Sequence, residues 1–311
     1  MSVKARVVSS QLLGKLRGPR RRALWGACAL IWGALASTAA AAQNSRLVAY
    51  VVMGQQGAVA RAVVEGNANC PKIEIGPDQP SMDVRARPSS GFPVTVCEKL
   101  IPPGTKSASI LGTPLPVPKN SLTSIVVFGD TGCRPKLQEN CSANKWPFRG
   151  LSDNAAKSHP DLVIHVGDYR YRTPTDCASC DDDWKAWQDD FFAPAKQLLA
   201  AAPWIAARGN HEICSRGGRG YFLLLAPGES TQCKDDKVDI APYTVTIGER
   251  QFIVFDSSGL PHEKIPDVER YTEQFKNAVK LVKPHSWFIT HVPNLGSKGR
   301  GLYRRYFATG T

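Results

Sequence analysis

The stretch Ser124-Ile125-Val126-Val127-Phe128-Gly129-Asp130-Thr131-Gly132 joins a short apolar run to an aspartate between two glycines. The run is rich in β-branched and aromatic residues, which favours a buried strand, and Gly-Asp-Thr-Gly is typical of a tight turn at the strand's end. By itself this pattern indicates only a turn. In open α/β sheets, however, ligands bind at the carboxyl ends of the strands. We therefore expect the Asp130 side chain to lie where such a sheet binds its ligand.

Three later stretches repeat this design, because each is a strand-like run that ends in a polar residue. They are Val163-Ile164-His165-Val166-Gly167-Asp168-Tyr169-Arg170-Tyr171, Trp204-Ile205-Ala206-Ala207-Arg208-Gly209-Asn210-His211-Glu212 and Ser286-Trp287-Phe288-Ile289-Thr290-His291. Apolar residues at helical steps of three and four lie between or beside them: Trp184, Trp187, Phe191, Ala195 and Leu198, then Val268, Tyr271, Phe275, Ala278 and Val282. Residues 243–247 and 251–255 read as a hairpin. Strands that alternate with helices predict a layered α/β domain over 121–311, with the strand-end residues at one edge.

Residues 43–120 show a different pattern, in which short apolar runs alternate with Gly, Pro and Asn clusters and no helical period appears. This pattern predicts a small all-β domain with strands near 47–53, 59–64, 73–75, 84–87, 93–97 and 108–111. Prolines at 102, 103, 114, 116 and 118 form a stiff connector into the α/β domain. The predicted organisation is therefore a leader over 1–42, a β-rich domain with its linker over 43–120, and the α/β domain over 121–311.

The first 42 residues have the pattern of a targeting segment. Basic residues at 4, 6, 15, 17 and 20–22 precede an apolar run over 23–37 and the small-residue exit Thr38-Ala39-Ala40-Ala41-Ala42. This order is typical of a secretory signal peptide cleaved near Ala42, and Arg20-Arg21-Arg22 leaves the twin-arginine route open as well. The apolar run is shorter than the ~20 residues that span a bilayer, which argues against an anchor. We expect a periplasmic or secreted protein with no stable membrane anchor after cleavage.

The leader also changes how the charge is interpreted. The 311-residue chain has a net charge of +12 and a pI near 9.3, values that would suggest a nucleic-acid partner. Seven basic residues and no acidic residue precede Gln43, so removing the leader lowers +12 to about +5. A mildly basic mature chain suits an anionic small molecule such as a phosphate ester, with no specific nucleic acid. The sequence leaves the oligomeric state open.

Eight of the nine cysteines lie after the leader, and an even number in an exported chain favours disulfides. Sequence proximity suggests the pairs Cys70–Cys97, Cys133–Cys141, Cys177–Cys180 and Cys214–Cys233, although sequence alone leaves the connectivity open. Cys177-Ala178-Ser179-Cys180 also has the spacing of a redox or zinc motif. No second such motif is present in the sequence, so we favour a disulfide there.

The strand-end residues together offer a set of metal ligands: Asp130, Asp168, Tyr171, Asn210 and His291. Singly, each has an ordinary interpretation as a loop cap, a turn residue or a core side chain. As a group they are oxygen-rich with one nitrogen, a donor set that suits Fe, Mn or Zn. Two carboxylates brought together repel each other unless a cation lies between them. Two ions about 3.5–4 Å apart can clamp a phosphoryl oxygen and activate a shared water for attack on phosphorus.

The order of these motifs resembles the calcineurin-like metallophosphoesterase superfamily, and within it the purple acid phosphatase branch. Most of the superfamily has Asp-x-His in the first motif, whereas the purple branch has Gly at the third position, as Gly132 here, and a tyrosine three residues after its second aspartate, as Tyr171 here. The resemblance covers residues 121 to 291. It implies a four-layer α/β/β/α sandwich and an acid phosphatase-like hydrolase with a hydroxide bridging two metal ions.

The resemblance also implies a role for each residue. Asp130 and Tyr171 would bind Fe(III), Asp168 would bridge both ions, and Asn210 and His291 would bind a second ion, Fe, Zn or Mn. His211 would act beside the leaving group as general acid or transition-state stabiliser, oriented by Glu212. Tyr169 competes with Tyr171 for the phenolate role, but the spacing favours Tyr171. His165 is expected to be buried or behind the ligands, and His159, His262 and His285 to be surface or loop residues.

The chain departs from the family pattern after His291. A final Gly-His-x-His motif that supplies one histidine to each ion is expected there, but the twenty residues that follow contain no histidine. This predicts a domain truncated before its last motif. The alternative function is therefore an impaired phosphoesterase-like protein that binds metal or phosphate weakly or has no activity. A disulfide-stapled structural module is a third interpretation, but it leaves the four strand-end motifs unexplained. Whether a substrate is a monoester, a diester or a nucleotide stays open.

Overall fold

The computed structural model describes residues 47–135, 138–142, 145–174, 181–228, 233–260 and 268–292. These residues all belong to one compact unit that starts at Gln43. The predicted leader, the Cys177–Cys180 pair, His262 and the histidine-free tail after 292 lie outside the described residues.

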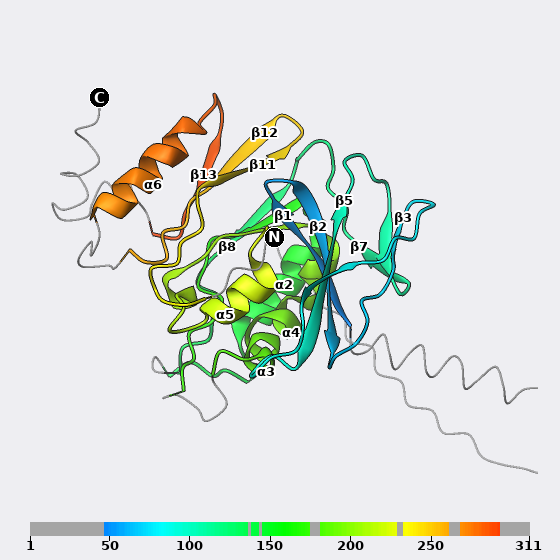
Figure 1. Cartoon of the computed structure of the whole chain (residues 1–311), viewed down its shortest axis with the longest axis horizontal. Coiled ribbons are helices and arrows are strands. Elements are labelled where there is room, and N and C mark those ends of the chain that lie inside the picture. The colour runs from blue at the N-terminus through cyan, green and yellow to red at the C-terminus, as the bar shows by residue number, and fades with distance from the viewer. Residues whose placement is uncertain are drawn as a thin grey trace, which may run out of the picture. The chain divides into compact units, whose positions relative to one another are not determined.

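A seven-stranded mixed sheet forms the centre of this unit (Figure 1). Its strands, in spatial order, are β4 (Asp83–Ala86), β5 (Val94–Ile101), β2 (Gly57–Glu65), β1 (Val48–Gly54), β10 (Trp204–Ala206), β9 (Leu162–His165) and β8 (Ile125–Phe128). Neighbours are parallel from β1 through β10 and β9 to β8, and antiparallel from β1 to β4. The three strands that lead into the first three motifs are therefore adjacent and point the same way.

Side chains of the inner strands of this sheet are buried on both faces, because successive residues of a strand point to opposite sides. In β1, Tyr50 and Val52 belong to one core, whereas Val51 and Met53 belong to another. The first core lies between the sheet and a helical layer. That layer comprises α2 (Pro147–Lys157), the continuous helical stretch α3 (Trp184–Trp187), η2 (Gln188–Phe192) and α4 (Ala193–Ala201), and α5 (Gly218–Gly220) with η4 (Tyr221–Leu225).

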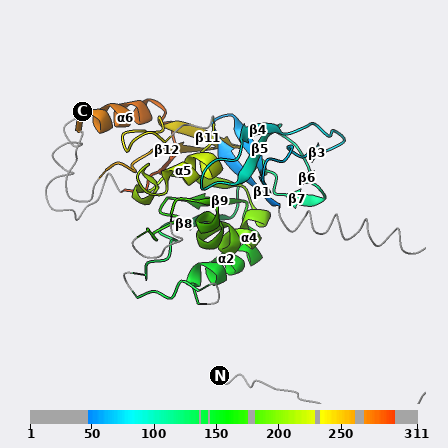
Figure 2. The same cartoon turned by 60° about the horizontal axis from the view of Figure 1, so that its bottom comes forward.

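The second core lies between the main sheet and a smaller sheet of β11 (Tyr243–Ile247), β12 (Arg250–Val254) and β13 (Trp287–Ile289). The other face of the smaller sheet packs on α6 (Val268–Lys280) through Ile253, Phe255, Tyr271 and Ala278. Figure 2 shows α6 on one side, α2 and α4 on the opposite side, and the strands between them. The predicted four-layer α/β/β/α sandwich is therefore confirmed, as are the helical pattern over 184–201 and the 243–255 hairpin.

The expected β-rich region is present, but it shares its sheet with the later strands. Strand β1 pairs in parallel with β10, and β2, β5 and β4 continue the same sheet outward. Only β3 (Ile73–Ile75), β6 (Ala108–Ile110) and β7 (Thr113–Leu115) form a separate three-stranded sheet. Pairing between segments about 150 residues apart depends on long-range packing, which local sequence patterns do not report.

Three of the suggested disulfides are present, Cys70–Cys97, Cys133–Cys141 and Cys214–Cys233. The second and third close loops that follow β8 and β10, on the side of the sheet where the motif residues lie. Among the described helices, none combines the length and apolar character that a membrane span requires.

Candidate metal centre

The candidate site lies at the carboxyl ends of strands from both sheets. Asp130 follows β8, Asp168 follows β9, and Asn210 begins the short helix η3 (Asn210–Glu212) after β10. His291 follows β13, which belongs to the smaller sheet. The register pairs Phe128 with His165, and His165 with Ala206, so the loops that carry the first three residues leave the sheet side by side.

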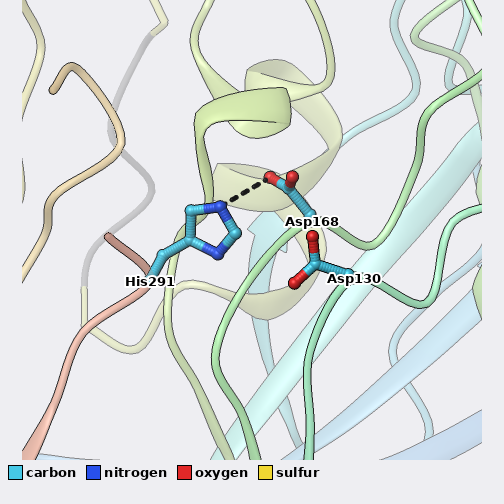
Figure 3. Close-up of side chains that lie close together, drawn as sticks. All are labelled: Asp130, Asp168 and His291. Atoms are coloured by element: carbon cyan, nitrogen blue, oxygen red, sulfur yellow. Dashed lines mark ion pairs between the residues drawn. The ribbon is translucent and has the colours of Figure 1, made fainter. Parts of the chain in front are cut away.

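Asp130, Asp168 and His291 converge (Figure 3). Each offers one ligand atom, and these atoms lie within 4.8 Å of one another. His291 Nε2 is 3.4 Å from Asp168 Oδ1, the contact drawn as a dashed line in Figure 3. Asp168 is buried, His291 is partly buried and Asp130 is exposed, so the group is open to solvent on the Asp130 side.

The two aspartates reach this position through an unusual backbone conformation. Asp130 and Asp168 have φ values of 56° and 60°, in the left-handed region that Asp tolerates better than most residues. Their loops are bonded to each other, since Asp130 N donates to Gly167 O at 3.0 Å and Gly132 N donates to Asp168 O at 3.3 Å. A Cβ on Gly209 would lie 2.3 Å from Asp168 N, so the third loop also requires a glycine for its close approach.

Tyr171 lies in the site and Tyr169 does not. The Tyr171 hydroxyl donates a short hydrogen bond to Asp130 Oδ1, and its ring lies 4.1 Å from that of His211. Burial and the Asp130 carboxylate raise the pKa of the Tyr171 phenol above its ordinary value. Tyr169 is fully buried, and its hydroxyl donates to Ala207 O at 3.0 Å. The Tyr171 side chain therefore lies beside Asp130, whereas the Tyr169 side chain lies in the core.

His291 presents one nitrogen to the site in an acceptor-rich setting. Its Nδ1 is 3.1 Å from Val166 O, and because a carbonyl oxygen only accepts, Nδ1 carries the proton. Nε2 then faces Asn210 Oδ1 at 2.9 Å as well as Asp168 Oδ1. Burial opposes a positive ring, but the Asp168 carboxylate outweighs burial and raises the pKa of His291.

These contacts fit a metal ion. Nε2, the Asn210 amide oxygen and the Asp168 carboxylate are three acceptors that face one another, an arrangement that calls for a proton or a cation between them. The hydrogen bond from Nδ1 to a backbone carbonyl is the usual way in which a metal-ligating histidine is oriented. Oxygen-rich donors with one imidazole suit a hard or borderline cation. The residues therefore fit the group that the sequence predicts.

His211 lies beside this group and contacts an arginine that the sequence did not single out. Its Nδ1 is 2.5 Å from Arg216 Nη2, and its Nε2 is 4.0 Å from Asp168 Oδ2. A guanidinium only donates, so Nδ1 is the acceptor and the ring proton of neutral His211 is on Nε2, toward Asp168. Burial, with the charge of Arg216, lowers the pKa of His211 to about 4 despite the opposing effect of Asp168.

Glu212 contacts the backbone rather than His211. Its Oε2 accepts from Asp168 N at 2.8 Å and Gly209 N at 3.1 Å, and its Oε1 accepts from Tyr169 N at 2.9 Å. The side chain is fully buried, and no hydrogen bond joins it to the His211 ring within the described part of the chain. The prediction that Glu212 orients His211 is therefore replaced by a different contact, in which Glu212 holds the Asp168 and Asn210 loops together.

The other histidines behave as predicted where they are described. His165 is fully buried, with Thr131 Oγ1 2.8 Å from Nε2 and Gly167 N donating to Nδ1 at 3.2 Å. Burial lowers its pKa to about 3, so this ring is neutral. His159 and His285 are exposed.

A cavity of about 410 Å³ opens beside Tyr171 and His211. Four arginines are among its lining residues, Arg170, Arg172, Arg216 and Arg219, and Asp181, Asp182 and Asp183 also line it. Sequence reasoning missed this arginine group. The sequence did contain an indication of this group. A glycine-rich stretch with two arginines follows the third motif directly: Ser215-Arg216-Gly217-Gly218-Arg219-Gly220.

Known proteins resemble this chain in sequence and fold. A family model described as calcineurin-like phosphoesterase matches residues 123–306. A curated relative, a nucleotide pyrophosphatase/phosphodiesterase of Hordeum vulgare, is 26% identical over 184 residues, which cover 56% of this chain and 48% of that protein.

Among solved structures, the purple acid phosphatase PPD1 from yellow lupin (Lupinus luteus) seeds has a TM-score of 0.50 at 15% identity, over 77% of this chain and 50% of that one. PhoD aligns with a TM-score of 0.43 at 13% identity, over 70% and 52% of the two chains. The chain thus spans about half the length of the relatives it matches, and the likeness to the lupin structure shows a shared fold.

Proposed function

We propose that this chain, which belongs to the calcineurin-like phosphoesterase family, hydrolyses phosphate esters at the centre formed by Asp130, Asp168 and His291. The convergence of these three ligand atoms within 4.8 Å is the observation that carries the proposal. The names of the barley and lupin proteins, a phosphodiesterase and an acid phosphatase, support the same class of reaction.

Five residues would hold the metal ions. We assign Asp130 and Tyr171 to a first ion, Asp168 to both ions, and Asn210 and His291 to a second ion. Fe(III) is proposed at the tyrosine side and Fe, Zn or Mn at the other. When bound, such ions would polarise the phosphoryl group and lower the pKa of a water beside it toward neutrality. The Tyr171 phenol, which now donates a hydrogen bond to Asp130, would bind as a phenolate after losing that proton.

His211 would interact with the leaving group. Because Arg216 donates to Nδ1, the proton of the neutral His211 ring is on Nε2. This N–H would donate a hydrogen bond to the departing oxygen and stabilise the charge that develops there, and a positioned donor of this kind contributes ~10²–10³-fold to rate. Glu212 contributes indirectly, since it fixes the backbone of Asp168 and of Gly209, the residue before Asn210.

The test combines metal content, visible absorbance and hydrolysis of p-nitrophenyl phosphate by the purified chain. About two metal ions per chain, an absorbance band lost in Tyr171→Phe and turnover lost in Asp168→Ala are the expected results. The matched control is Tyr169→Phe, which removes a hydroxyl from the same loop but from outside the site. A metal-free, colourless and inactive wild type would overturn the proposal and favour the impaired alternative.

We propose further that the protein works outside the cytoplasm, in the periplasm or after secretion. The three disulfides support this, because such bonds persist in oxidising compartments. Fractionation of cells that express the full chain tests it. Recovery of a shortened chain from the exported fraction is expected, and full-length protein in the cytosol would contradict it.

A further inference from the structure

We infer that the cavity beside His211 is an anion subsite for the leaving group, and that the preferred substrates carry a second phosphate there, as organic diphosphates do. The inference rests on the proposed function, since it assumes hydrolysis at the adjacent centre. Arg216 is the residue on which recognition of the second phosphate would depend.

The cavity begins at the candidate metal centre. Tyr171 and His211 line it and also lie at the candidate metal centre. His211 faces the centre with Nε2 and faces Arg216 with Nδ1, so the cavity extends from the centre past His211. A group that departs toward His211 therefore enters the cavity. Its volume of about 410 Å³ falls in the range of ~300–1,000 Å³ that ligand pockets occupy.

The arginines differ in how much of their charge is already neutralised. Arg170 and Arg172 share the buried carboxylate of Asp190, and Arg170 also lies 3.6 Å from Asp182. Arg216 and Arg219 have no carboxylate partner among the residues that the structure describes. Arg219 donates to Ser90 O at 2.6 Å and lies over the Phe92 ring, and the Arg216 guanidinium donates to the ring of His211.

The acidic residues of the cavity are mostly committed to the fold. Asp182 accepts from Trp187 Nε1 at 2.8 Å and from Gly220 N. Asp183 caps the helix by accepting from Ala186 N at 2.8 Å. Asp181 is exposed. Arg216, which contacts His211, thus remains available to a ligand, and guanidinium groups bind phosphate through two parallel hydrogen bonds.

A second phosphate changes the charge of the leaving group. In a diphosphate, water adds to the terminal phosphorus, the bond from that phosphorus to the bridging oxygen breaks, and the bridging oxygen leaves as part of a phosphate. The products are inorganic phosphate and a monophosphate, and the water's second proton passes to solvent. The leaving group gains negative charge rather than a proton, which a guanidinium stabilises. A simple monoester instead releases an alkoxide that must be protonated.

The experiment compares adenosine 5′-diphosphate with adenosine 5′-monophosphate, which differ by the second phosphate. Initial rates of phosphate release give kcat/KM for each with the metal-loaded full chain. We expect the wild type to prefer the diphosphate by at least ~10-fold. Arg216→Gln should reduce this preference ~10–100-fold, the usual effect of losing a hydrogen bond to a charged group. Arg216→Lys should restore part of it, because it returns the charge without the planar fork.

The matched control is Arg134→Gln. Arg134 lies 5.2 Å from the Tyr171 ring but does not line the cavity, and it is paired with Glu139. This variant should leave the ratio of the two kcat/KM values unchanged. An equal loss on both substrates in Arg216→Gln would overturn the inference, because Arg216 would then act only through His211. A wild type that prefers the monophosphate would overturn it too.

A binding measurement keeps the inference separate from the proposed function. Calorimetric titration of the metal-free chain with the diphosphate should show weak binding that Arg216→Gln abolishes, whether or not the chain is active. Equal affinity of the wild type and Arg216→Gln for the diphosphate would contradict the subsite. Absence of hydrolysis together with Arg216-dependent binding would contradict only the proposed function. Unchanged thermal unfolding of each variant would show that the substitution has not disrupted the fold.

Discussion

The Glu212 carboxylate accepts a hydrogen bond from the backbone N–H of Asp168 at 2.8 Å, across 44 residues of sequence. The two carboxylate oxygens have different partners. Oε2 also accepts from Gly209 N, and Oε1 accepts from Tyr169 N and Arg170 N. A single buried side chain thereby fixes the loops after β9 and β10 in one arrangement. Asp168 and Asn210 can meet His291 only while these loops are held together.

Glu212→Gln tests this relationship with almost no change of shape. In either orientation the amide nitrogen would face two backbone N–H groups and could accept from neither. An unpaired buried donor costs about 1–3 kcal/mol, so we expect a loss of at least this size in the free energy of unfolding. Urea unfolding measures it. The same change at the exposed Glu273, 4.0 Å from Lys276, should cost less than about 0.5 kcal/mol. Equal stability of the two variants would contradict the role given to Glu212.

Gly132→Ala should displace Tyr171. A Cβ at this position would lie 2.6 Å from both the Tyr171 backbone nitrogen and its ring Cδ2. Backbone atoms cannot move aside cheaply, and overpacking of this kind costs about 1–3 kcal/mol. We expect lower stability and loss of the tyrosine-dependent absorbance in the metal-loaded chain. Gly150→Ala is the control, because open space surrounds Gly150 in helix α2 and alanine there should stabilise by about 0.5–1 kcal/mol. A Gly132→Ala chain that kept its absorbance would argue against the contact.

Much of the site follows from sequence patterns because it rests on strand ends. Parallel neighbouring strands bring residues at their carboxyl ends together, so the runs before Asp130, Asp168 and Asn210 predicted one edge. The strand-like run before His291 likewise predicted a strand-end residue, but local patterns did not report that this strand belongs to a second sheet. Spacing also separated Tyr171 from Tyr169, since two residues along a loop turned one ring into the site and the other into the core.

Long-range contacts account for what the sequence did not reveal. The role of Glu212 depends on which backbone N–H groups a folded turn exposes, and the role of Arg216 depends on which cavity its loop borders. The merging of β1 with β10 into one sheet is likewise a pairing between distant segments. Residue types and their spacing indicate candidate ligands and local structure. Which distant residues contact one another is decided by the packing of the whole fold.

Arg85→Ala should destabilise the segment that carries the arginine loop. The Arg85 side chain is 1% exposed, pairs with Glu98 at 2.9 Å and donates to the carbonyls of Phe222 and Leu223 within η4. Arg61 still pairs with Glu98 after this change, but the carbonyls lose their donors, and a buried group left unpaired costs about 1–3 kcal/mol. Urea unfolding of Arg87→Ala is the comparison, because exposed Arg87 should contribute less than about 0.5 kcal/mol. An equally small loss in the free energy of unfolding at both positions would contradict the role of Arg85 in holding η4.

Stability should depend on acid pH through Asp161, at the start of the β9 motif. Burial alone would raise the pKa of this carboxyl, but Lys119 and the donors of Thr123 and Ser124 outweigh burial and hold the pKa below its usual range. A depressed folded-state pKa contributes stability above the unfolded value near ~3.9, which is lost as the pH falls through the folded value. Asp161→Asn should therefore be less stable than wild type at pH 7, by about 1–3 kcal/mol, with the gap closing below pH ~4. A gap that stayed constant in urea unfolding from pH 7 to pH 3 would contradict this assignment.

Removal of metal should lower thermal stability, and the effect should depend on the converging ligands. Nε2 of His291 faces two oxygen acceptors, an arrangement that a bound cation would relieve. A ligand that binds only the folded state stabilises by about 2.7 kcal/mol at one hundred times its Kd. We expect a chelator to lower the Tm of the metal-loaded wild type by several degrees, and to have little effect on His291→Ala or Asp168→Asn. The control Asp181→Asn changes an exposed carboxylate outside the group and should respond as wild type does. An equal response from all four proteins would mean that the metal binds elsewhere, because the loss of a true ligand removes the linkage between binding and folding.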